Sequence, residues 1–218
     1  MKSKYDLPSL SKQFYVGLVC DVLDYFGYRN QSLGAAFQPL EPDMVLMGRA
    51  YTTRAVPAGK MTKESMVNQC KSIEGVKDGE IYVMACQGAY LAGVWGEIMS
   101  TGVRVNGGVG ALIDGMIRDS NQVKEMQFPV ISRGHLPTTA KGRMEIVDIQ
   151  CDVVIDGVTI HPGDLIFGDL DGVAIIPQQI EDEVIERCLA ILASENVVRD
   201  RVLAGDPISK VYMEIGAI

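Results

Sequence analysis

The stretch Gly96–Asp119, GEIMSTGVRVNGGVGALIDGMIRD, constrains the fold of this chain more than any other part of the sequence. Its first part, from Glu97, has the apolar spacing of a short helix, and glycines end that helix. An apolar run, Val109–Ile113, then has the character of a buried strand, and Arg118 and Asp119 stand beyond its end. Ligands of open α/β sheets bind at that end of the strands, so the stretch predicts an α/β fold with a site there.

The rest of the chain alternates helical and strand patterns. A four-residue apolar stripe predicts a helix over Leu10–Gly27, and Pro39–Pro57 reads as two strands joined by a turn. A buried strand is expected over Ile81–Cys86, and Asp156-Gly157 is typical of a hairpin turn. A long amphipathic helix is expected to run to Leu203. The pattern indicates a mixed α/β protein with helices at its N- and C-terminal ends.

Length and composition bound the possible functions. The chain has 218 residues, the length of one compact domain, which we expect to cover residues 1–218. Its net charge of −8 comes without the clustered Lys and Arg that phosphate neutralisation needs, so no nucleic-acid partner is expected. No apolar run reaches the roughly 20 residues of a membrane span, and no signal-peptide pattern is present, so we expect a cytoplasmic protein with no membrane partner.

The sequence also bounds the kind of metal site. The chain has two histidines, and its five cysteines are scattered and odd in number, which indicates free thiols in a reducing compartment. The chain therefore offers few histidine and cysteine ligands for a zinc site of the usual nitrogen and sulfur type. Any metal is expected to be held by oxygen.

The pair Arg118 and Asp119 has two interpretations. Asp119 precedes a short helix and Gln122 follows three residues later, which is the pattern of an N-cap with a polar partner. Arg118 beside it can form an ordinary surface ion pair. Alternatively, an arginine and an aspartate beyond a buried strand can bind an anionic ligand together with a carboxylate-held Mg²⁺ or Mn²⁺. The pair by itself does not decide between them.

The start of the preceding helix is a second candidate. Glu97 reads either as an exposed helix residue or as part of a site. If the helix begins near Gly96, the amides of Ile98 and Met99 have no intrahelical acceptor and can bind a carboxylate. The glycines Gly107-Gly108 precede a strand rather than opening a helix, which argues against a dinucleotide-binding loop.

Six motifs, in this order, carry a resemblance that covers nearly the whole chain: VCDVLDYFG, VLMGRAYTTRAVP, GEIMSTGV, GALIDGMIRD, FPVISRG and VTIHPGDLIFGDLDGVAIIP. The chain resembles the class II pyruvate aldolases related to 4-hydroxy-4-methyl-2-oxoglutarate aldolase, a family that also contains the regulator of ribonuclease activity A. Older descriptions call its members demethylmenaquinone methyltransferase-like. The resemblance implies an α/β fold of stacked ββα type, like that of swivelling phosphohistidine domains, and homotrimers or hexamers with active sites between subunits.

The resemblance also implies roles for residues. Asp119 would hold a divalent metal, Mg²⁺ or Mn²⁺, largely through waters, and Arg118 would bind the keto oxygen of the substrate. Backbone amides of Ile98 and Met99, beside Gly96, would hold the pyruvate carboxylate. The remaining implied roles belong to three residues: Glu97, which would position a water for proton transfer; Gln122, in the second shell of the metal; and Glu195, which would reach that shell from a neighbouring subunit.

Two positions depart from the family pattern. Glu97 stands where that pattern has Asp, and Gln122 where it has Glu or Asp. A glutamate carboxylate is displaced by about an ångström, which matters in a positioned site. The amide of Gln122 can hydrogen-bond a metal-bound water but carries no charge, so divalent-ion retention is expected to be weaker.

Two functions follow as hypotheses. The first is a metal-dependent lyase that cleaves a 4-hydroxy-2-oxo acid to pyruvate and a carbonyl compound, with oxaloacetate decarboxylation through the same pyruvate enolate. The second is a non-catalytic regulator that binds a ribonuclease or another protein partner, which the acidic charge and Gln122 motivate. His135, Lys141 and His161 are candidates for reading the substrate beyond its pyruvyl end, and each reads equally well as a loop residue.

Overall fold

The computed structural model describes residues 4–215, which form two compact units. The first ends at Gln178 and contains a nine-stranded sheet and a two-stranded hairpin. The second begins at Gln179 and is helical. The strands are β1 Gln38–Pro39, β2 Leu46–Pro57, β3 Glu80–Ala85, β4 Gly93–Trp95, β5 Gly110–Ile117, β6 Val130–His135, β7 Met144–Ile149, β8 Val153–Ile155, β9 Val158–Ile160, β10 Leu165–Asp169 and β11 Gly172–Ile176. The helices are α1 Leu7–Leu10, α2 Val16–Tyr25, α3 Lys63–Glu74, α4 Glu97–Val105, α5 Ser120–Glu125, η1 Gln178–Ile180, α6 Glu181–Leu203 and α7 Ile208–Ile215.

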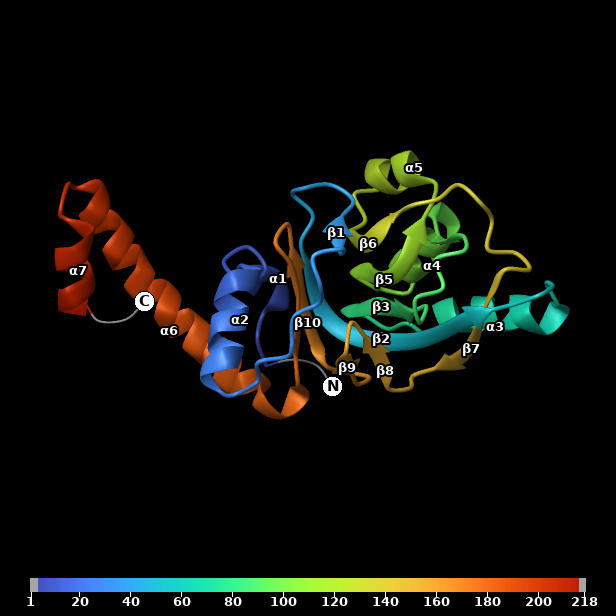
Figure 1. Ribbon diagram of the computed structural model, residues 1–218, viewed down its shortest axis with the longest axis horizontal. Coiled ribbons are helices and arrows are strands. Elements are labelled where there is room, and N and C mark those ends of the chain that lie inside the picture. The colour runs from blue at the N-terminus through green and yellow to red at the C-terminus, as the bar shows by residue number, and fades with distance from the viewer. Residues whose placement is uncertain (1–3, 216–218) are drawn as a thin grey trace. The chain divides into compact units, whose positions relative to one another are not determined.

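The centre of the large sheet is parallel. Strands β6, β5, β3 and β2 lie side by side in that order (Figure 1), and each pairs in parallel with the next. Antiparallel strands complete the two sides, with β1 on β6 and β10 with β11 beyond β2. The short β4 pairs with the end of β5, and β7 pairs with the end of β2. The ends of these strands are where polar residues gather.

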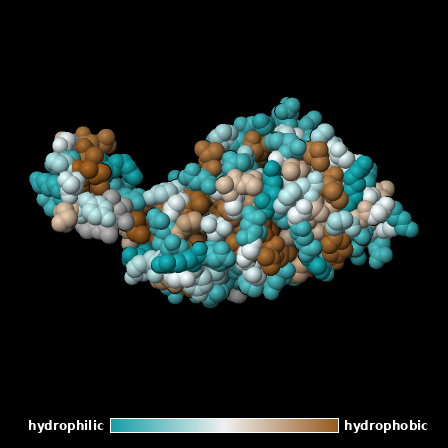
Figure 2. All heavy atoms as spheres, viewed as in Figure 1, coloured by the Kyte–Doolittle hydropathy of each residue, from teal (hydrophilic) through white to brown (hydrophobic). Residues whose placement is uncertain are grey.

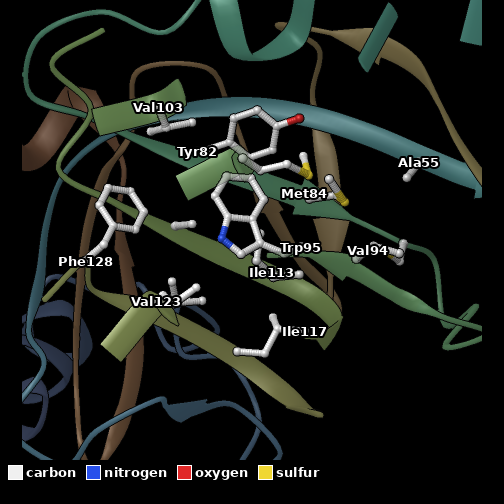
Figure 3. Packing of buried hydrophobic residues seen from close by; sticks show 14 of the residues in the cluster. Ala55, Tyr82, Met84, Val94, Trp95, Val103, Ile113, Ile117, Val123 and Phe128 are labelled. Carbon is white, nitrogen blue, oxygen red and sulfur yellow. The ribbon is translucent and has the colours of Figure 1, made fainter. Parts of the chain in front are cut away.

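Both faces of the sheet are buried, as β3 illustrates. Tyr82 and Met84 pack into one hydrophobic cluster together with Trp95, while Ile81 and Val83 pack into a second cluster on the opposite face. Figure 3 shows the rings of Tyr82 and Trp95 against each other, with centroids 4.9 Å apart. Burial on both faces explains why this strand is a continuous apolar run rather than an alternating one.

The expected α/β fold with helices toward both ends is confirmed, and several bounds differ from expectation. Pro39–Pro57 does not form two strands joined by a turn, because β2 crosses that region as one long strand. The strand expected to end at Ile113 continues to Ile117, so Asp114 lies within β5. The first long helix begins at Val16 rather than Leu10. That one domain covers residues 1–218 stays a prediction.

A partly buried arginine helps to explain how Asp114 is tolerated inside β5. Arg133 Nε donates to Asp114 Oδ1 at 2.6 Å, and a second guanidinium nitrogen donates to Asp156 Oδ1 at 2.5 Å. The arginine side chain is 10% exposed and that of Asp114 4%. The guanidinium also lies over the rings of Phe37 and Tyr90, 4.2 and 5.3 Å from their centroids. This group ties the hairpin turn at Asp156 to the large sheet.

One arginine links the two helices of the second unit. Arg201 near the end of α6 donates to Asp206 at 2.8 Å and to Glu214 of α7 at 2.6 Å. The helix α7 had not been expected from the sequence. None of the helices within residues 4–215 combines the length and the apolar character that a bilayer crossing requires. Figure 2 shows apolar residues on the viewed surface in separate groups among hydrophilic ones.

Replacing Arg133 tests the buried charge network. We expect Arg133→Met to lower the free energy of unfolding by about 3 kcal/mol, because it leaves the carboxylate of Asp114 buried without its cation. The exposed Arg29 provides the control, and Arg29→Met is expected to change stability by less than about 0.5 kcal/mol. Urea denaturation followed by circular dichroism measures both. Equal midpoints for the two variants would contradict the assignment.

Candidate functional site

The candidate site lies where the end of β5 meets the beginning of α4. The Arg118 amide donates to the Trp95 carbonyl at 2.9 Å, which brings the residue after β5 beside the residue before α4. Arg118 Nε lies 3.7 Å from Asp119 Oδ2. The two side chains are 39% and 40% exposed, so both are accessible to a ligand. The structure therefore brings together the pair that the sequence singled out.

Gly96 allows the close approach of these groups. A Cβ atom at Gly96 would lie 2.5 Å from Asp119 Oδ2 and 3.4 Å from Arg118 Cγ. Its φ of −169° is extended backbone, which any residue adopts, so the need for glycine here comes from space alone. The Asp119 carboxylate thus sits against the backbone at the start of α4.

Asp119 does not act as a capping side chain. It occupies the N-cap position of α5 with a φ of 55°, in the left-handed region, and makes no side-chain cap hydrogen bond. The expected capping partner, Gln122, is exposed on α5. Asp119 therefore stands at the N-cap position where it was expected, but the capping hydrogen bond expected from its side chain is not formed. The carboxylate is left available to a ligand.

The N-terminus of α4 faces the same place. Gly96 is its N-cap residue, and no side chain caps this end. Ile98 and Met99 lie in the first turn, where backbone amides lack intrahelical acceptors and attract anions. A carboxylate at this end would lie next to Arg118, since Gly96 contacts that side chain.

Two acidic residues that were expected at the site, Glu97 and Glu195, do not line the cavity. Glu97 is half-buried in the first turn of α4, and its Oε1 accepts a hydrogen bond from Thr101 at 2.9 Å. It is not among the residues that line the cavity beside Arg118. Glu195 belongs to α6 of the second unit, where Arg199 lies 3.8 Å from its carboxylate. The roles expected for both residues stay predictions.

A cavity of about 300 Å³ opens beside Arg118 and Asp119. Its wall comes from α3, β3, β4, β7, the start of α4 and the loop before β7. Lys141 of that loop lines it, as do Glu145 and several methionines. Met99 was expected at the site, but the other residues of this group were missed, because they come from elements far apart in the sequence and follow ordinary core or strand patterns: Met61, Met66, Met84, Met144 and Glu145.

The two histidines do not reach this cavity. His135, expected in a loop, is the last residue of β6, and its Nδ1 lies 2.9 Å from Ser120 Oγ. His161 Nδ1 lies 2.8 Å from Asp152 Oδ1, and this hydrogen bond raises the pKa of the imidazole. Of the three polar candidates for reading the far end of a substrate, the structure places only Lys141 on the wall.

The donor set fits a cation bound mainly through water. Within residues 4–215, no group of three or more His, Cys, Asp and Glu side chains is arranged to hold a metal ion. Magnesium, however, usually keeps several waters and takes one or two protein carboxylates. Asp119 supplies one such carboxylate, uncapped and beside a glycine that leaves it room.

Comparison with known proteins gives consistent matches. The family model described as RraA-like, Aldolase/RraA, matches residues 17–175. An uncharacterized protein of Methanocaldococcus jannaschii is 34% identical over 90% of this chain and 94% of its own length. A Halalkalibacterium halodurans protein, provisionally named 4-hydroxy-4-methyl-2-oxoglutarate aldolase, is 28% identical over 85% of each chain. Protein DlpA of Legionella pneumophila is 29% identical over 88% of this chain, which spans only 31% of the length of DlpA.

Solved structures share the fold. A crystal structure described as that of novel cellulases from microbes associated with the gut ecosystem aligns with a TM-score of 0.83 at 30% identity, over 90% of this chain and 89% of the other. RraAS2 of Streptomyces coelicolor, described as an unusual member of the RNase ES inhibitor RraA protein family, aligns with a TM-score of 0.77 at 23% identity. That alignment covers 91% of this chain and 99% of the other.

The absence of a cap at Asp119 predicts that its charge is not needed for folding. Asp119→Asn keeps a residue that tolerates the left-handed backbone, and we expect a change in the free energy of unfolding of less than about 0.5 kcal/mol. Thr62→Ala is the comparison, because the Thr62 hydroxyl accepts from the Ser65 amide at 3.0 Å in a true capping box. Its loss is expected to cost about 1 kcal/mol. An equal loss in both variants, measured by urea denaturation, would assign Asp119 a structural role.

Proposed function

The chain belongs to the RraA-like family, and from that membership we propose that it is a divalent-metal-dependent lyase. The proposed reaction cleaves a 4-hydroxy-2-oxo acid to pyruvate and a carbonyl compound, as the provisional aldolase name of its relative suggests. Decarboxylation of oxaloacetate through the same enolate is the accompanying activity. We propose Mg²⁺ or Mn²⁺ as the metal.

One observation carries the proposal. The Asp119 carboxylate, the Arg118 side chain and an uncapped helix N-terminus lie together at Gly96, where a Cβ atom would meet Asp119 Oδ2 at 2.5 Å and Arg118 Cγ at 3.4 Å. The helix N-terminus suits a carboxylate, the guanidinium of Arg118 suits a keto oxygen, and Asp119 suits a hydrated cation. A 2-oxo acid presents the carboxylate and the keto oxygen on adjacent carbons, so it matches the first two groups at once.

Each residue has a separate task in the proposed reaction. The amides of Ile98 and Met99 bind the carboxylate of the 2-oxo acid, and Arg118 hydrogen-bonds its keto oxygen. A water positioned by Glu97 accepts the proton of the 4-hydroxyl, the C3–C4 bond breaks, and its electron pair moves into the C2–C3 bond to give the enolate. Protonation at C3 then yields pyruvate. A divalent cation near Asp119 supplies Lewis-acid stabilisation of the developing charge.

Charge stabilisation is the largest contribution expected from Arg118. Preorganised donors aimed at an oxygen that gains charge typically contribute about 10²- to 10³-fold to the rate. No lysine Schiff base is required, because Arg118 would hold the oxygen that gains charge, and a bound divalent cation would supply further Lewis-acid stabilisation. The same arrangement serves oxaloacetate, whose loss of carbon dioxide also leaves pyruvate enolate.

We further propose a homo-oligomer, a trimer or hexamer, with the site completed at a subunit interface. Glu195 of a neighbouring subunit and Gln122 would contribute to the hydrated shell of the cation through their oxygens. Neither residue would need to bind the cation directly, because a cation of this type usually keeps several of its waters and the residues would hydrogen-bond those waters. The proposed location is the cytoplasm.

The activity is predicted to depend on Arg118. We expect Arg118→Ala to reduce kcat/KM for metal-dependent pyruvate release at least about 100-fold, because the charge on the keto oxygen loses its donor. Arg104→Ala is the matched control, since Arg104 is an exposed arginine of the adjacent α4 that does not line the cavity. Pyruvate is followed with Mn²⁺ and either 4-hydroxy-4-methyl-2-oxoglutarate or oxaloacetate.

The competing function is a non-catalytic regulator that binds a ribonuclease or another protein. Absence of metal-dependent pyruvate release above background, with unchanged kinetics in Arg118→Ala, would overturn the lyase proposal. Capture of a ribonuclease under the same conditions would then support the regulator. Turnover without any captured partner decides for the enzyme.

The space left by Gly96 gives an independent prediction. Gly96→Ala keeps an allowed backbone but places a methyl group 2.5 Å from Asp119 Oδ2, so that carboxylate must move. We expect Mn²⁺ affinity to fall about tenfold or more, with a parallel loss of turnover. Gly59→Ala is the control, because a Cβ at Gly59 meets nothing within 4 Å. Free Mn²⁺ is measured by electron paramagnetic resonance, and unchanged affinity in Gly96→Ala would contradict the placement of the cation at Asp119.

A further inference from the structure

The cavity beside Arg118 and Asp119 has two chemically different parts. The charged pair forms one part of its wall, together with the start of α4. Most of the remaining wall is apolar and unusually rich in methionine. Its apolar members, called here the methionine wall, are Ala55, Met61, Met66, Ile73, Met84, Val94, Trp95, Ile98, Met99, Ala140, Met144 and Ile146.

The methionine wall is continuous with the hydrophobic core. Met84, Trp95 and Met99 belong to the core cluster on this face of the sheet and are buried. Figure 3 shows Met84 close to the indole of Trp95. Toward the outside, Met61 and Met66 remain 46% and 48% exposed. A ligand entering past these two side chains would exchange water for apolar surface, and flexible methionines adapt to its shape.

Three polar side chains that line the cavity already make hydrogen bonds within the protein. The Ser65 hydroxyl takes part in the capping box of α3, and the Thr139 hydroxyl accepts from the Lys141 amide. The Gln69 amide donates to Met99 Sδ at 3.4 Å. Each of these contacts uses hydrogen-bonding capacity that a second polar group of a ligand would need.

A second carboxylate would find little support on this wall. Among the described residues that line the cavity, Lys141 is the only cation besides Arg118, and it is exposed. Glu145 on the same wall adds a negative charge that disfavours another carboxylate. Burying an anionic group against methionine and tryptophan without a partner is costly, whereas an apolar group gains from the same contact.

We propose that the substrate of this site carries an apolar substituent beyond its pyruvyl end, bound by the methionine wall. The inference rests on the proposed function for the charged end of the cavity. Within the proposed substrate class, it favours 2-oxo acids with an aliphatic or aromatic tail. Dicarboxylic 2-oxo acids such as 4-hydroxy-4-methyl-2-oxoglutarate and oxaloacetate are then turned over less efficiently than a counterpart with an apolar tail, although their pyruvyl end is identical.

Trp95 offers a measurement that does not depend on turnover. It is the single tryptophan of the chain, and it lines the cavity, so its fluorescence reports occupancy. With Mn²⁺ present, we compare 5-methyl-2-oxohexanoate with 2-oxoglutarate, in which a carboxylate replaces the isopropyl group. Neither can undergo the proposed cleavage, because neither has a 4-hydroxyl group. Pyruvate, which has the same 2-oxo acid end and no tail, is the reference ligand. We expect 5-methyl-2-oxohexanoate to bind about tenfold tighter than 2-oxoglutarate or pyruvate.

Variants locate the tail on the wall. Met66→Lys is expected to abolish the preference for 5-methyl-2-oxohexanoate and leave pyruvate binding unchanged, because it places a cation where the tail lies. Met61→Lys is a second test at the same opening. Val147→Lys is the matched control, since Val147 is an exposed apolar residue of β7 outside the lining. The three residues are 42–48% exposed, and circular dichroism checks that each variant folds.

The possible results separate this inference from the function on which it rests. Tighter binding of 2-oxoglutarate, lost in Lys141→Met, would overturn the apolar tail in favour of a second carboxylate while leaving the lyase intact. Equal binding of all three acids would place the tail outside the cavity and would also overturn the inference. Failure of all three acids, pyruvate included, to bind would remove the proposed function, and the apolar tail with it.

Discussion

The hydrogen bond from the Arg118 amide to the Trp95 carbonyl holds the site together. It joins the end of β5 to the start of α4, two segments that the chain separates by a whole helix. Through it, the side chains after one element face the amides that begin another. The sheet beneath is buried on both faces, so the strand ends are the places where charged groups remain accessible.

The central part of the fold was readable from sequence because its signals are local. The apolar run in β3 and the hairpin turn at Asp156-Gly157 each report their own conformation. The length of β5 was not readable. Asp114 looks like a strand terminator, but within the strand its carboxylate is bound by Arg133 and by donors of Cys86 and Tyr90, all distant from it in sequence. The single strand β2 was missed for a similar reason, since its conformation depends on partners along both edges.

The site was predictable in part. Arg118, Asp119 and Gly96 are close in the structure because they flank one helix–strand unit, and the sequence shows such a unit directly. The wall formed by Met66, Met84 and other apolar residues could not be predicted from the sequence. Those residues come from separate elements, and a methionine in a helix or strand carries no mark that distinguishes a cavity wall from a core. Only the assembled fold reveals their common surface.

The left-handed backbone of Asp119 has an evolutionary consequence. Aspartate and asparagine occupy this conformation more readily than most residues with a side chain, although Gln87, Gln127 and Gln150 of this chain adopt it as well. Between the two acidic residues, the left-handed backbone therefore favours aspartate over glutamate. The dihedral angle of one residue thereby biases which substitutions can keep a negative charge at this position.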